Sequence, residues 1–394
     1  MSAMELLQIF SGGPATRVAL PNLEEALSII RMIMKLLQEP TSRAKFVLTE
    51  GFILLLHGLL ELPSCPRAED HNAKDLDSTC SQLGGLLVEL SMLPEFTESI
   101  NTYTSSPLVE LLYANMTTES EHIAGPCIHI LANMASTDKR SVQLLEQTNV
   151  AQSSIAMLEE KTNTRLTPSL LHLLRNLAIP EQNREALGEI RAIHALSRYW
   201  SATITPTEQM EALSCTRVLV TNCASNVGLL FARIISEDSS KLKRLLEVYR
   251  ETDTIDIKMQ IARIVAESVK SIYNSTSKEL VTTDVRLLKD SDSMSLETPL
   301  FDMVSQDKWP IICPQGWLAL VLLIRHSQTT RQAIATRVVE PDIYNVLKKA
   351  VETGSRETQS NAKVFIHELL EAGDKVIAPE NHRTQLMNLL QFGH

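Results

Sequence analysis

The residue types that most often carry out chemistry are scattered through this chain without catalytic spacing. No nucleophile elbow, phosphate-binding loop or HExxH zinc motif occurs, and none of the ten histidines has a cysteine or carboxylate at ligand spacing. His57, His129, His172 and His194 lie in apolar, helix-like stretches, where a hydrogen-bonded core or groove histidine is the expected role. We therefore predict no catalytic residue, no metal site, no cofactor and no enzyme activity.

Composition and charge narrow the classes of partner. The formal net charge of −10 disfavours nucleic acid, because phosphate contacts need a basic surface. The most apolar stretches, Gly51–Leu60 and Trp317–Ile324, are too short to cross a bilayer, and no signal peptide or lipidation motif is visible. The six cysteines form no CxxC pair, as expected of reduced thiols. We expect a cytoplasmic protein with no nucleic-acid partner and no direct membrane insertion.

One polar position recurs along the chain at a nearly constant spacing. It is the sixth residue of a nine-residue window, as in IHILANMAS (Ile128–Ser136) and LHLLRNLAI (Leu171–Ile179). Successive spacings are 44, 43, 46, 45, 58 and 43 residues, a period expected of armadillo and HEAT repeats. The residues at this position are Glu89, Asn133, Asn176, Asn222, Glu267, Arg325 and Glu368.

The side chains at the recurring position indicate peptide binding. An asparagine offers two donors and an acceptor, so a row of them can clamp an extended backbone. Glu89 and Glu267 add charge-assisted partners for lysine or arginine. Arg325 and Lys35 interrupt the acidic run, so a cation-binding stretch is expected only in the central part of the chain.

A second interpretation of the asparagines is structural. Asn133, Asn176 and Asn222 can bond to neighbouring backbone and hold successive helices in register, and one residue can serve both roles. His129 and His172 precede two of these asparagines by one helical turn, so they are expected to flank the same groove.

The elements that position these residues are helices. Stretches such as Val142–Glu160, Asn183–Trp200 and Arg331–Ala350 each indicate a short helix, a tight corner and an amphipathic helix. We predict an all-α fold, a right-handed α-solenoid of armadillo repeats. It is expected to be one array over residues 1–394, with about eight or nine units and loop insertions at 63–78 and 275–310. The third helices should line a concave groove.

Three segments resemble the Smg-type GDP dissociation stimulators, armadillo-repeat regulators of Rho- and Rap-type small GTPases. They are LLRNLAIPEQNREAL (Leu173–Leu187), ILANMAS (Ile130–Ser136) and LLIRHSQTTRQAI (Leu322–Ile334), and the likeness covers roughly 84–370. The resemblance implies that the concave face holds a GTPase and favours GDP release without catalytic side chains. It also implies a contribution from the basic, often prenylated tail of the GTPase.

The resemblance assigns GTPase binding to Asn133 and Asn176, and we extend that role to Asn222. Lys35 stands where an acidic residue would help to hold a basic tail, and no prenyl pocket can be located. The chain begins inside what looks like the second helix of a repeat, which implies that N-terminal units of longer relatives are absent.

Two other classes of armadillo protein remain as alternatives. Importin-α-like adaptors carry tryptophan four residues before each ladder asparagine, whereas His129, His172 and Val218 occupy those positions here. A generic scaffold or a myosin-directed co-chaperone is the other alternative. The predicted GTPase-binding set is therefore Glu89, Asn133, Asn176, Asn222 and Glu267, flanked by His129 and His172.

Overall fold

The computed structural model describes most of the chain as helices joined by short connections. The described residues are 23–48, 51–64, 73–102, 106–160, 164–201, 203–234, 239–274, 295–326, 328–371 and 380–391. The predicted partial repeat at the start of the chain lies outside them.

The chain forms two compact units, unit 1 (Met1–Leu177) and unit 2 (Ala178–His394), where a single array was predicted. The helices of unit 1 are α2 (Leu23–Leu36), α3 (Pro40–Leu48), α4 (Gly51–Glu61), η1 (Leu62–Ser64), α5 (Ala73–Ser91), α6 (Pro94–Thr102), α7 (Ser106–Asn115), α8 (Glu121–Met134), α9 (Asp138–Gln147), α10 (Val150–Glu160), η3 (Thr164–Leu166) and α11 (Thr167–Ala178), whose last residue belongs to unit 2.

Unit 2 continues the same pattern of short and long helices. Its elements are α12 (Glu181–Glu189), α13 (Ala192–Ser197), α14 (Pro206–Val220), α15 (Ala224–Phe231), β1 (Arg233–Ile234), β2 (Ser239–Ser240), α16 (Lys241–Glu251), α17 (Ile255–Asn274), α19 (Glu297–Val304), η5 (Pro310–Ile312), α20 (Cys313–His326), α21 (Gln328–Val338), α22 (Pro341–Thr353), α23 (Arg356–Glu371) and α24 (Glu380–Gln391).

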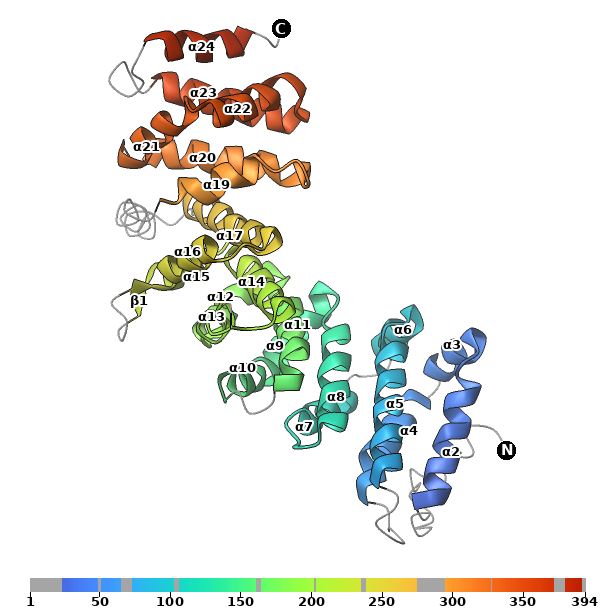
Figure 1. The fold of residues 1–394 in the computed structure, drawn as a ribbon. Helices are drawn as coiled ribbons and strands as arrows, with labels where there is room; N and C mark the ends of the chain where they lie inside the picture. The colour runs from blue at the N-terminus through green and yellow to red at the C-terminus, as the bar shows by residue number, and fades with distance from the viewer. Residues whose placement is uncertain are drawn as a thin grey trace. The chain divides into compact units, whose positions relative to one another are not determined.

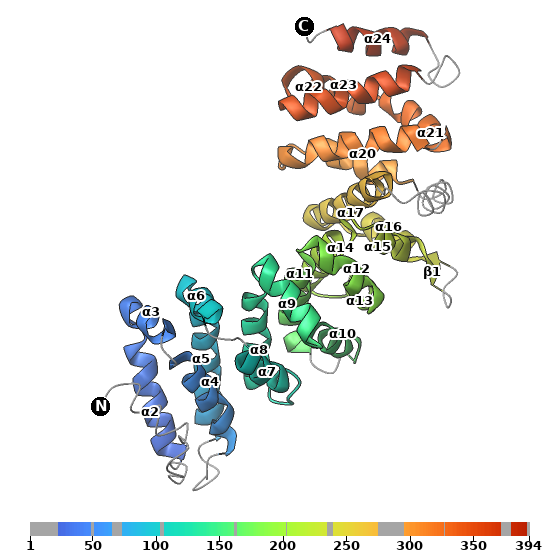
Figure 2. The same ribbon diagram turned by 180° about the vertical axis from the view of Figure 1, so that it is seen from behind.

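The helices follow a three-helix repeat. The long third helices among the described residues are α2, α5, α8, α11, α14, α17, α20 and α23. In unit 1, α5 contacts both α2 and α8; in unit 2, α17 lies between α14 and α20, and α20 contacts α23. Figures 1 and 2 view the molecule from opposite sides, and both show α17, α20 and α23 stacked in that order. The all-α prediction is confirmed for these residues.

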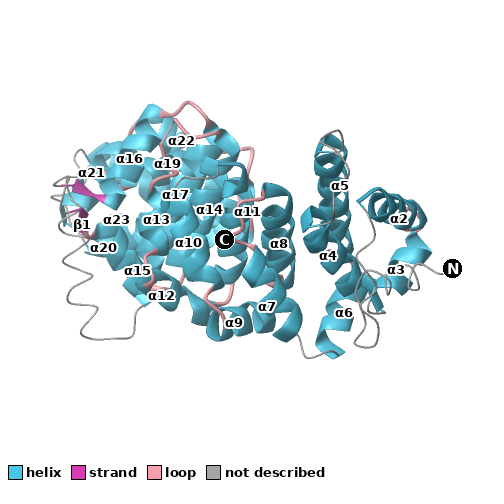
Figure 3. Ribbon diagram, turned by 90° about the horizontal axis from the view of Figure 1, so that it is seen from below, coloured by secondary structure: helices cyan, strands magenta, loops and turns pink. Residues whose placement is uncertain are grey.

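Two details differ from the prediction. The segment 63–78, predicted as a loop, ends in the first residues of α5, and the segment 275–310, also predicted as a loop, contains α19; residues 65–72 and 275–294 lie outside the described part. An antiparallel pair joins Arg233 to Ser240 and Ile234 to Ser239, although no strand was predicted. Figure 3 shows β1 against an otherwise helical background.

Local sequence signals explain several helix starts. At α14, Thr205 caps the helix by accepting from the amide of Glu208, while its hydroxyl donates to the Glu208 carboxylate at 2.7 Å. Pro206 follows at the first helical position, where its missing N–H costs nothing. Ser240 caps α16 in the same manner. The long helices then bury one apolar face against the next repeat, and tertiary packing supplies most of their stability.

Candidate interaction surface

Three of the predicted residues lie close together on neighbouring third helices of unit 1. Asn133 of α8 donates through Nδ2 to Ser91 Oγ at 2.7 Å and to the Val88 carbonyl at 3.4 Å, both beside Glu89 on α5. Asn176 of α11 donates to the carbonyl of Ala132, the residue before Asn133, at 2.9 Å. Glu89, Asn133 and Asn176 therefore form a continuous series, the acceptor row.

The asparagine amides close the preceding third helix. Val88 and Ala132 lie in the last turns of α5 and α8, where backbone carbonyls lack a main-chain partner within the helix; the Val88 carbonyl accepts from Ser91 Oγ of its own helix at 2.7 Å. Asn176 supplies that partner for Ala132 from the next repeat, whereas Asn133 bonds mainly to Ser91 Oγ and only secondarily to Val88. Both asparagines therefore join neighbouring third helices, in agreement with the structural interpretation. No hydrogen bond from the described residues reaches either Oδ1 atom. The donors are used internally, and the acceptors remain for a partner.

Glu89 completes the acceptor row with a carboxylate. Its side chain is 60% exposed and lies 3.2 Å from Arg43 on α3. Arg43 also donates to the Leu37 carbonyl at 2.6 Å, so this guanidinium caps the C-terminal end of α2 and pairs with Glu89 at the same time. An exposed ion pair of this kind contributes little to stability. The carboxylate is therefore positioned and remains accessible to a cation.

The two predicted flanking histidines lie one turn before the asparagines. His129 forms a 2.7 Å hydrogen bond with Ser169, and His172 contacts Asn176 at 3.3 Å. Burial, and secondarily the nearby His172, lowers the pKa of His129 below its ordinary value. His129 is therefore neutral near pH 7, and at that pH it adds no positive charge beside the acceptor row.

The prediction for Asn222 is wrong in its placement. Asn222 lies beyond the end of α14, exposed, in a turn with a φ of 50°. Asparagine tolerates this left-handed conformation better than most residues, which explains why the helix ends there. The next third helix, α17, instead caps the carbonyl of Val220, which accepts a hydrogen bond from Ser271 Oγ at 2.7 Å. By this contact, Thr221 is the counterpart of Asn133.

The prediction for Glu267 is also wrong in its placement. Its side chain is only 8% exposed and lies 3.0 Å from Lys270, one turn along α17. Ser271, four residues further along α17, makes the contact that the asparagines make in unit 1. The nine-residue window is thus one helical turn out of register in α17. Glu267 is a buried, paired carboxylate rather than an open cation site.

The last two residues of the recurring series bind each other. Arg325 of α20 donates to Glu368 of α23 through Nη2 at 2.6 Å and Nε at 2.9 Å, and through Nη1 to Tyr273 of α17 at 3.4 Å. The hydrogen bond to Glu368 raises the pKa of Arg325. Both Glu368 and Glu89 are paired with an arginine, but Glu368 is only 21% exposed whereas Glu89 is 60% exposed. The carboxylate of unit 1 is therefore the more accessible of the two.

Sequence reasoning missed a set of arginines that close helices. Arg184 of α12 donates to the carbonyls of Ala178 at 3.2 Å, Ile179 at 2.8 Å and Thr221 at 2.6 Å. Arg331 donates to Ile324 at 2.9 Å in the same manner. The available signal was an arginine five or six residues after the end of a third helix, which places it six or seven residues beyond the carbonyl that it reaches. Arg184 belongs to the segment 173–187, so at least this residue of the segment has a structural role.

The described residues contain neither a metal-binding cluster nor a membrane-spanning helix. No group of three or more histidine, cysteine, aspartate or glutamate side chains is arranged to hold a metal ion. No described helix is long and apolar enough to cross a membrane.

Comparison with known proteins identifies the fold and nothing finer. No protein-family model and no curated protein sequence matches the chain. An engineered protein from a structural genomics programme matches with a TM-score of 0.61 and 15% identity, covering 99% of this chain and 94% of that one. A designed armadillo repeat protein in complex with a (KR)4 peptide matches with a TM-score of 0.51 and 12% identity, over 66% of this chain and 99% of that one.

A third structure extends the likeness along this chain. It concerns the interaction between cadherin and β-catenin and matches with a TM-score of 0.62 and 12% identity, over 93% of this chain and 66% of that one. At these identities the likeness establishes architecture alone. The chain has the armadillo-repeat fold, and the predicted right-handed α-solenoid of armadillo repeats is confirmed.

Proposed function

We propose that this chain binds a small GTPase of the Rho or Rap type through the acceptor row of unit 1 and favours release of GDP. The motifs at Ile130–Ser136 and Leu173–Leu187, which resemble the GDP dissociation stimulators, place their asparagines in this row. The basic, often prenylated C-terminal tail expected of such a GTPase is the segment that the row would hold.

The acceptor row carries the proposal because it combines an exposed carboxylate with two half-buried amide oxygens that no described donor uses. Glu89 offers a carboxylate, and Asn133 and Asn176 offer Oδ1 atoms whose own donors are already used. Ammonium, guanidinium and backbone N–H groups are the complementary donors. The designed armadillo protein of the same fold is described in complex with a (KR)4 peptide, which is consistent with such a partner.

Exchange in this proposal needs no proton transfer. A protein that binds the nucleotide-free GTPase more tightly than the GDP-bound form shifts the equilibrium toward release. Each tenfold difference in affinity between the two forms supplies about 1.4 kcal/mol. The side chains in the row act by holding the GTPase, so they are binding residues rather than catalytic ones.

The test is the release of fluorescent GDP from a panel of Rho, Rap and Ras proteins mixed with the full chain. We expect acceleration with one member, and Glu89→Gln should weaken binding about three- to tenfold through loss of one accessible charge. Glu267→Gln is the matched control, because its carboxylate is buried against Lys270 and should leave binding unchanged. Failure of every GTPase to bind at physiological salt contradicts the proposal.

An armadillo adaptor for basic peptides is the second candidate, and the same row favours it. The two functions separate in one experiment. Binding of a (KR)4 peptide that depends on Glu89, without any complex with a GTPase, identifies the adaptor. A stable GTPase complex without faster GDP release identifies a chaperone or sequestering role instead.

A further inference from the structure

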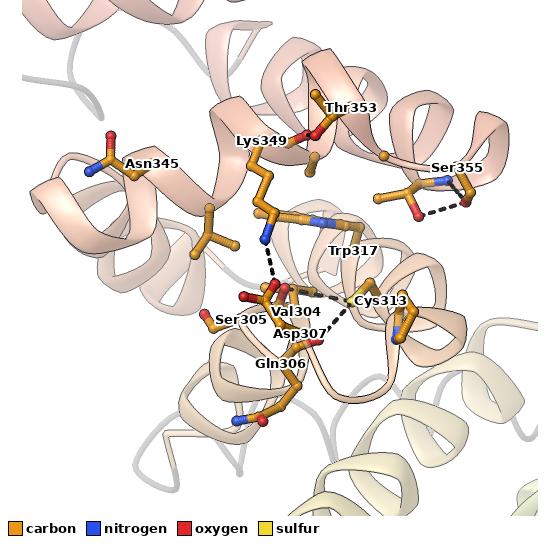
Figure 4. A pocket seen from close by; sticks show the side chains of 15 residues that line it. Val304, Ser305, Gln306, Asp307, Cys313, Trp317, Asn345, Lys349, Thr353 and Ser355 are labelled. Atoms are coloured by element: carbon orange, nitrogen blue, oxygen red, sulfur yellow. Dashed lines mark hydrogen bonds and ion pairs between the residues drawn. The ribbon is translucent and has the colours of Figure 1, made fainter.

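The two charged side chains that line a pocket of unit 2 are already paired with each other. This pocket, of about 610 Å³, is lined by α19, α20 and α22, and its Lys349 lies 2.5 Å from Asp307. Figure 4 shows the amino group of Lys349 directed at the Asp307 carboxylate. A pocket whose charges are matched selects neither an anion nor a cation. A charge without such a partner lies elsewhere in unit 2, on α17.

Arg263 is the one charged side chain of α17 that forms no ion pair, hydrogen bond or ring contact with the described residues. The other charged side chains of this helix are engaged: Asp256 with Lys308 at 3.3 Å, Glu267 with Lys270 at 3.0 Å, and Lys258 with the ring of Tyr249 at 5.5 Å. Arg263 is half-buried, and burial lowers the pKa of its guanidinium, a shift that the charge of Glu267 opposes only in part. A cation normally leaves water only when a partner compensates it, so folding alone does not account for an arginine here.

Gln260 lies one turn before Arg263 and shares its arrangement. The Oε1 atom of Gln260 and the Nε atom of Arg263 are buried and have no partner among the described residues. The Nε2 atom of Gln260 and the two Nη atoms of Arg263 are not buried, and they form no hydrogen bond to described residues either. A ligand can reach these outer nitrogens, although it cannot reach the buried atoms. Gln260 and Arg263 therefore present N–H groups side by side at the surface, and we call them the donor pair.

The donor pair lies on the side of α17 that corresponds to the acceptor row of unit 1. Ser271 makes the contact in α17 that Asn176 makes in α11, so Glu267, one turn before Ser271, is the counterpart of His172. Arg263 and Gln260 lie one and two turns before Glu267 on the same face of the helix. Third helices of unit 1 present acceptors on this side, whereas α17 presents donors.

The chemistry of the donor pair selects a carboxylate. The guanidinium of Arg263 donates charge-assisted hydrogen bonds to a carboxylate, and the amide of Gln260 adds a neutral donor one turn away. A cation is repelled by Arg263, and an uncharged group gains no charge assistance. Neither residue lines the pocket of about 610 Å³, so the donor pair is an open surface site. Small ligands need enclosure, and a side chain carried by a protein segment does not.

We propose that the donor pair binds an aspartate or glutamate side chain of an acidic segment in a partner protein. One carboxylate oxygen accepts from the Nη groups of Arg263, and the other accepts from Nε2 of Gln260. The segment thereby supplies the ion pair that α17 leaves open. This inference uses unit 2 alone, so it stands or falls independently of GTPase binding by unit 1.

The test measures binding of a (DE)4 peptide to the full chain by isothermal titration, with an uncharged (NQ)4 peptide beside it. We expect saturable binding of (DE)4 and none of (NQ)4, because only a carboxylate gains the charge-assisted bond to Arg263. Hydrogen exchange with bound (DE)4 should show protection in α17 rather than in α8 and α11. Absence of (DE)4 binding at millimolar concentration, equal binding of the two peptides, or protection centred on unit 1 overturns the proposal.

Two variants with the same change of charge separate Arg263 from the general field of α17. Arg263→Gln should weaken (DE)4 binding about tenfold, because it removes the guanidinium and keeps a polar side chain. Lys258→Gln is the matched control, since that lysine lies on the same helix against Tyr249 of α16, and it should change the affinity less than about twofold. Equal effects of the two variants contradict a carboxylate site at Arg263.

Stability gives an independent readout, because Arg263 has no internal partner to lose. Arg263→Gln should leave the urea midpoint unchanged or raise it, whereas loss of a structural ion pair would lower it. Gln260→Glu places a carboxylate one turn before Arg263 within the chain, so it should raise the midpoint and weaken (DE)4 binding about tenfold or more. A lower midpoint in Arg263→Gln, or unaltered (DE)4 binding by Gln260→Glu, shows that Arg263 is not an open carboxylate site.

Discussion

An asparagine side chain has two ends with different chemistry, and unit 1 uses one of them internally. The Nδ2 group of Asn176 closes the last turn of α8 through Ala132, while Oδ1 remains for a partner. The Nδ2 group of Asn133 ties α8 to the end of α5 mainly through Ser91 Oγ at 2.7 Å. One residue thus couples the stability of the repeat stack to the chemistry of its surface, because changing the side chain alters both.

The donor end of Asn176 should matter for stability. Asn176→Ala removes the cap on Ala132 and is expected to lower the free energy of unfolding by about 1 kcal/mol. Asn176→Asp should lower it further, because a carboxylate oxygen then faces the Ala132 carbonyl oxygen. Urea unfolding measures both. Asn345→Ala on α22 is the control, since this exposed side chain forms no hydrogen bond to described residues; equal losses in all three variants would contradict the assignment.

Unit 1 should lose stability in mild acid through His129. Burial lowers its pKa in the folded state, so the unfolded chain binds the proton more readily, and stability falls as pH drops below the unfolded value of about 6.5. The loss continues until pH passes the folded pKa. Urea unfolding from about pH 7.5 to about pH 5 should show this fall, and His129→Gln should reduce it. An unchanged pH profile in the variant would show that His129 is not responsible.

At the scale of helices, the ends of the elements decide where functional side chains point. Gly188 of α12 lies so close to α15 that an added Cβ would stand 1.7 Å from Asn226 Oδ1. The Nδ2 of that same Asn226 donates to the carbonyls of Arg184 at 2.7 Å and Leu219 at 2.9 Å. Asn226 therefore joins α12, α14 and α15, and glycine at 188 makes room for it.

The Gly188–Asn226 contact can be tested with two glycine-to-alanine variants that should change stability in opposite directions. Gly188→Ala is expected to destabilise by about 1–3 kcal/mol, because the methyl group displaces Asn226 from its two carbonyls. Gly228→Ala in α15 meets no atom within 4 Å and should stabilise by about 0.5–1 kcal/mol through the better helix propensity of alanine. Thermal unfolding distinguishes them, and similar shifts for both would refute the contact.

Element ends also explain how far the sequence could predict the site. The apolar period locates the third helices, and in α5, α8 and α11 the recurring residue stands where expected. In α14 the left-handed turn at Asn222 ends the helix earlier, and in α17 the contact shifts to Ser271. Apolar periodicity reports which face is buried but not where a helix stops. The Glu267–Lys270 pair, three residues apart, was visible in the sequence and was the available warning.

At the scale of the whole molecule, charge is divided unequally between the units. Residues 1–177 contain 12 lysines and arginines against 20 aspartates and glutamates, a net charge of −8 out of −10. Unit 2 is nearly balanced, and its Arg325 and half-buried Glu368 neutralise each other. The acidic field therefore surrounds the acceptor row, which attracts basic partners to unit 1.

The charge division predicts a salt-sensitive association with unit 1. Affinity for a (KR)4 peptide should fall about tenfold or more between about 50 mM and 300 mM salt, because the Debye length shrinks below the spacing of repeats. Isothermal titration measures the affinity, and hydrogen exchange with bound peptide should show protection in α5, α8 and α11 rather than in α17, α20 and α23. An acidic (DE)4 peptide is the control. Salt-independent binding, or protection centred on unit 2, would mean that the acceptor row and its surrounding charge do not recognise basic segments.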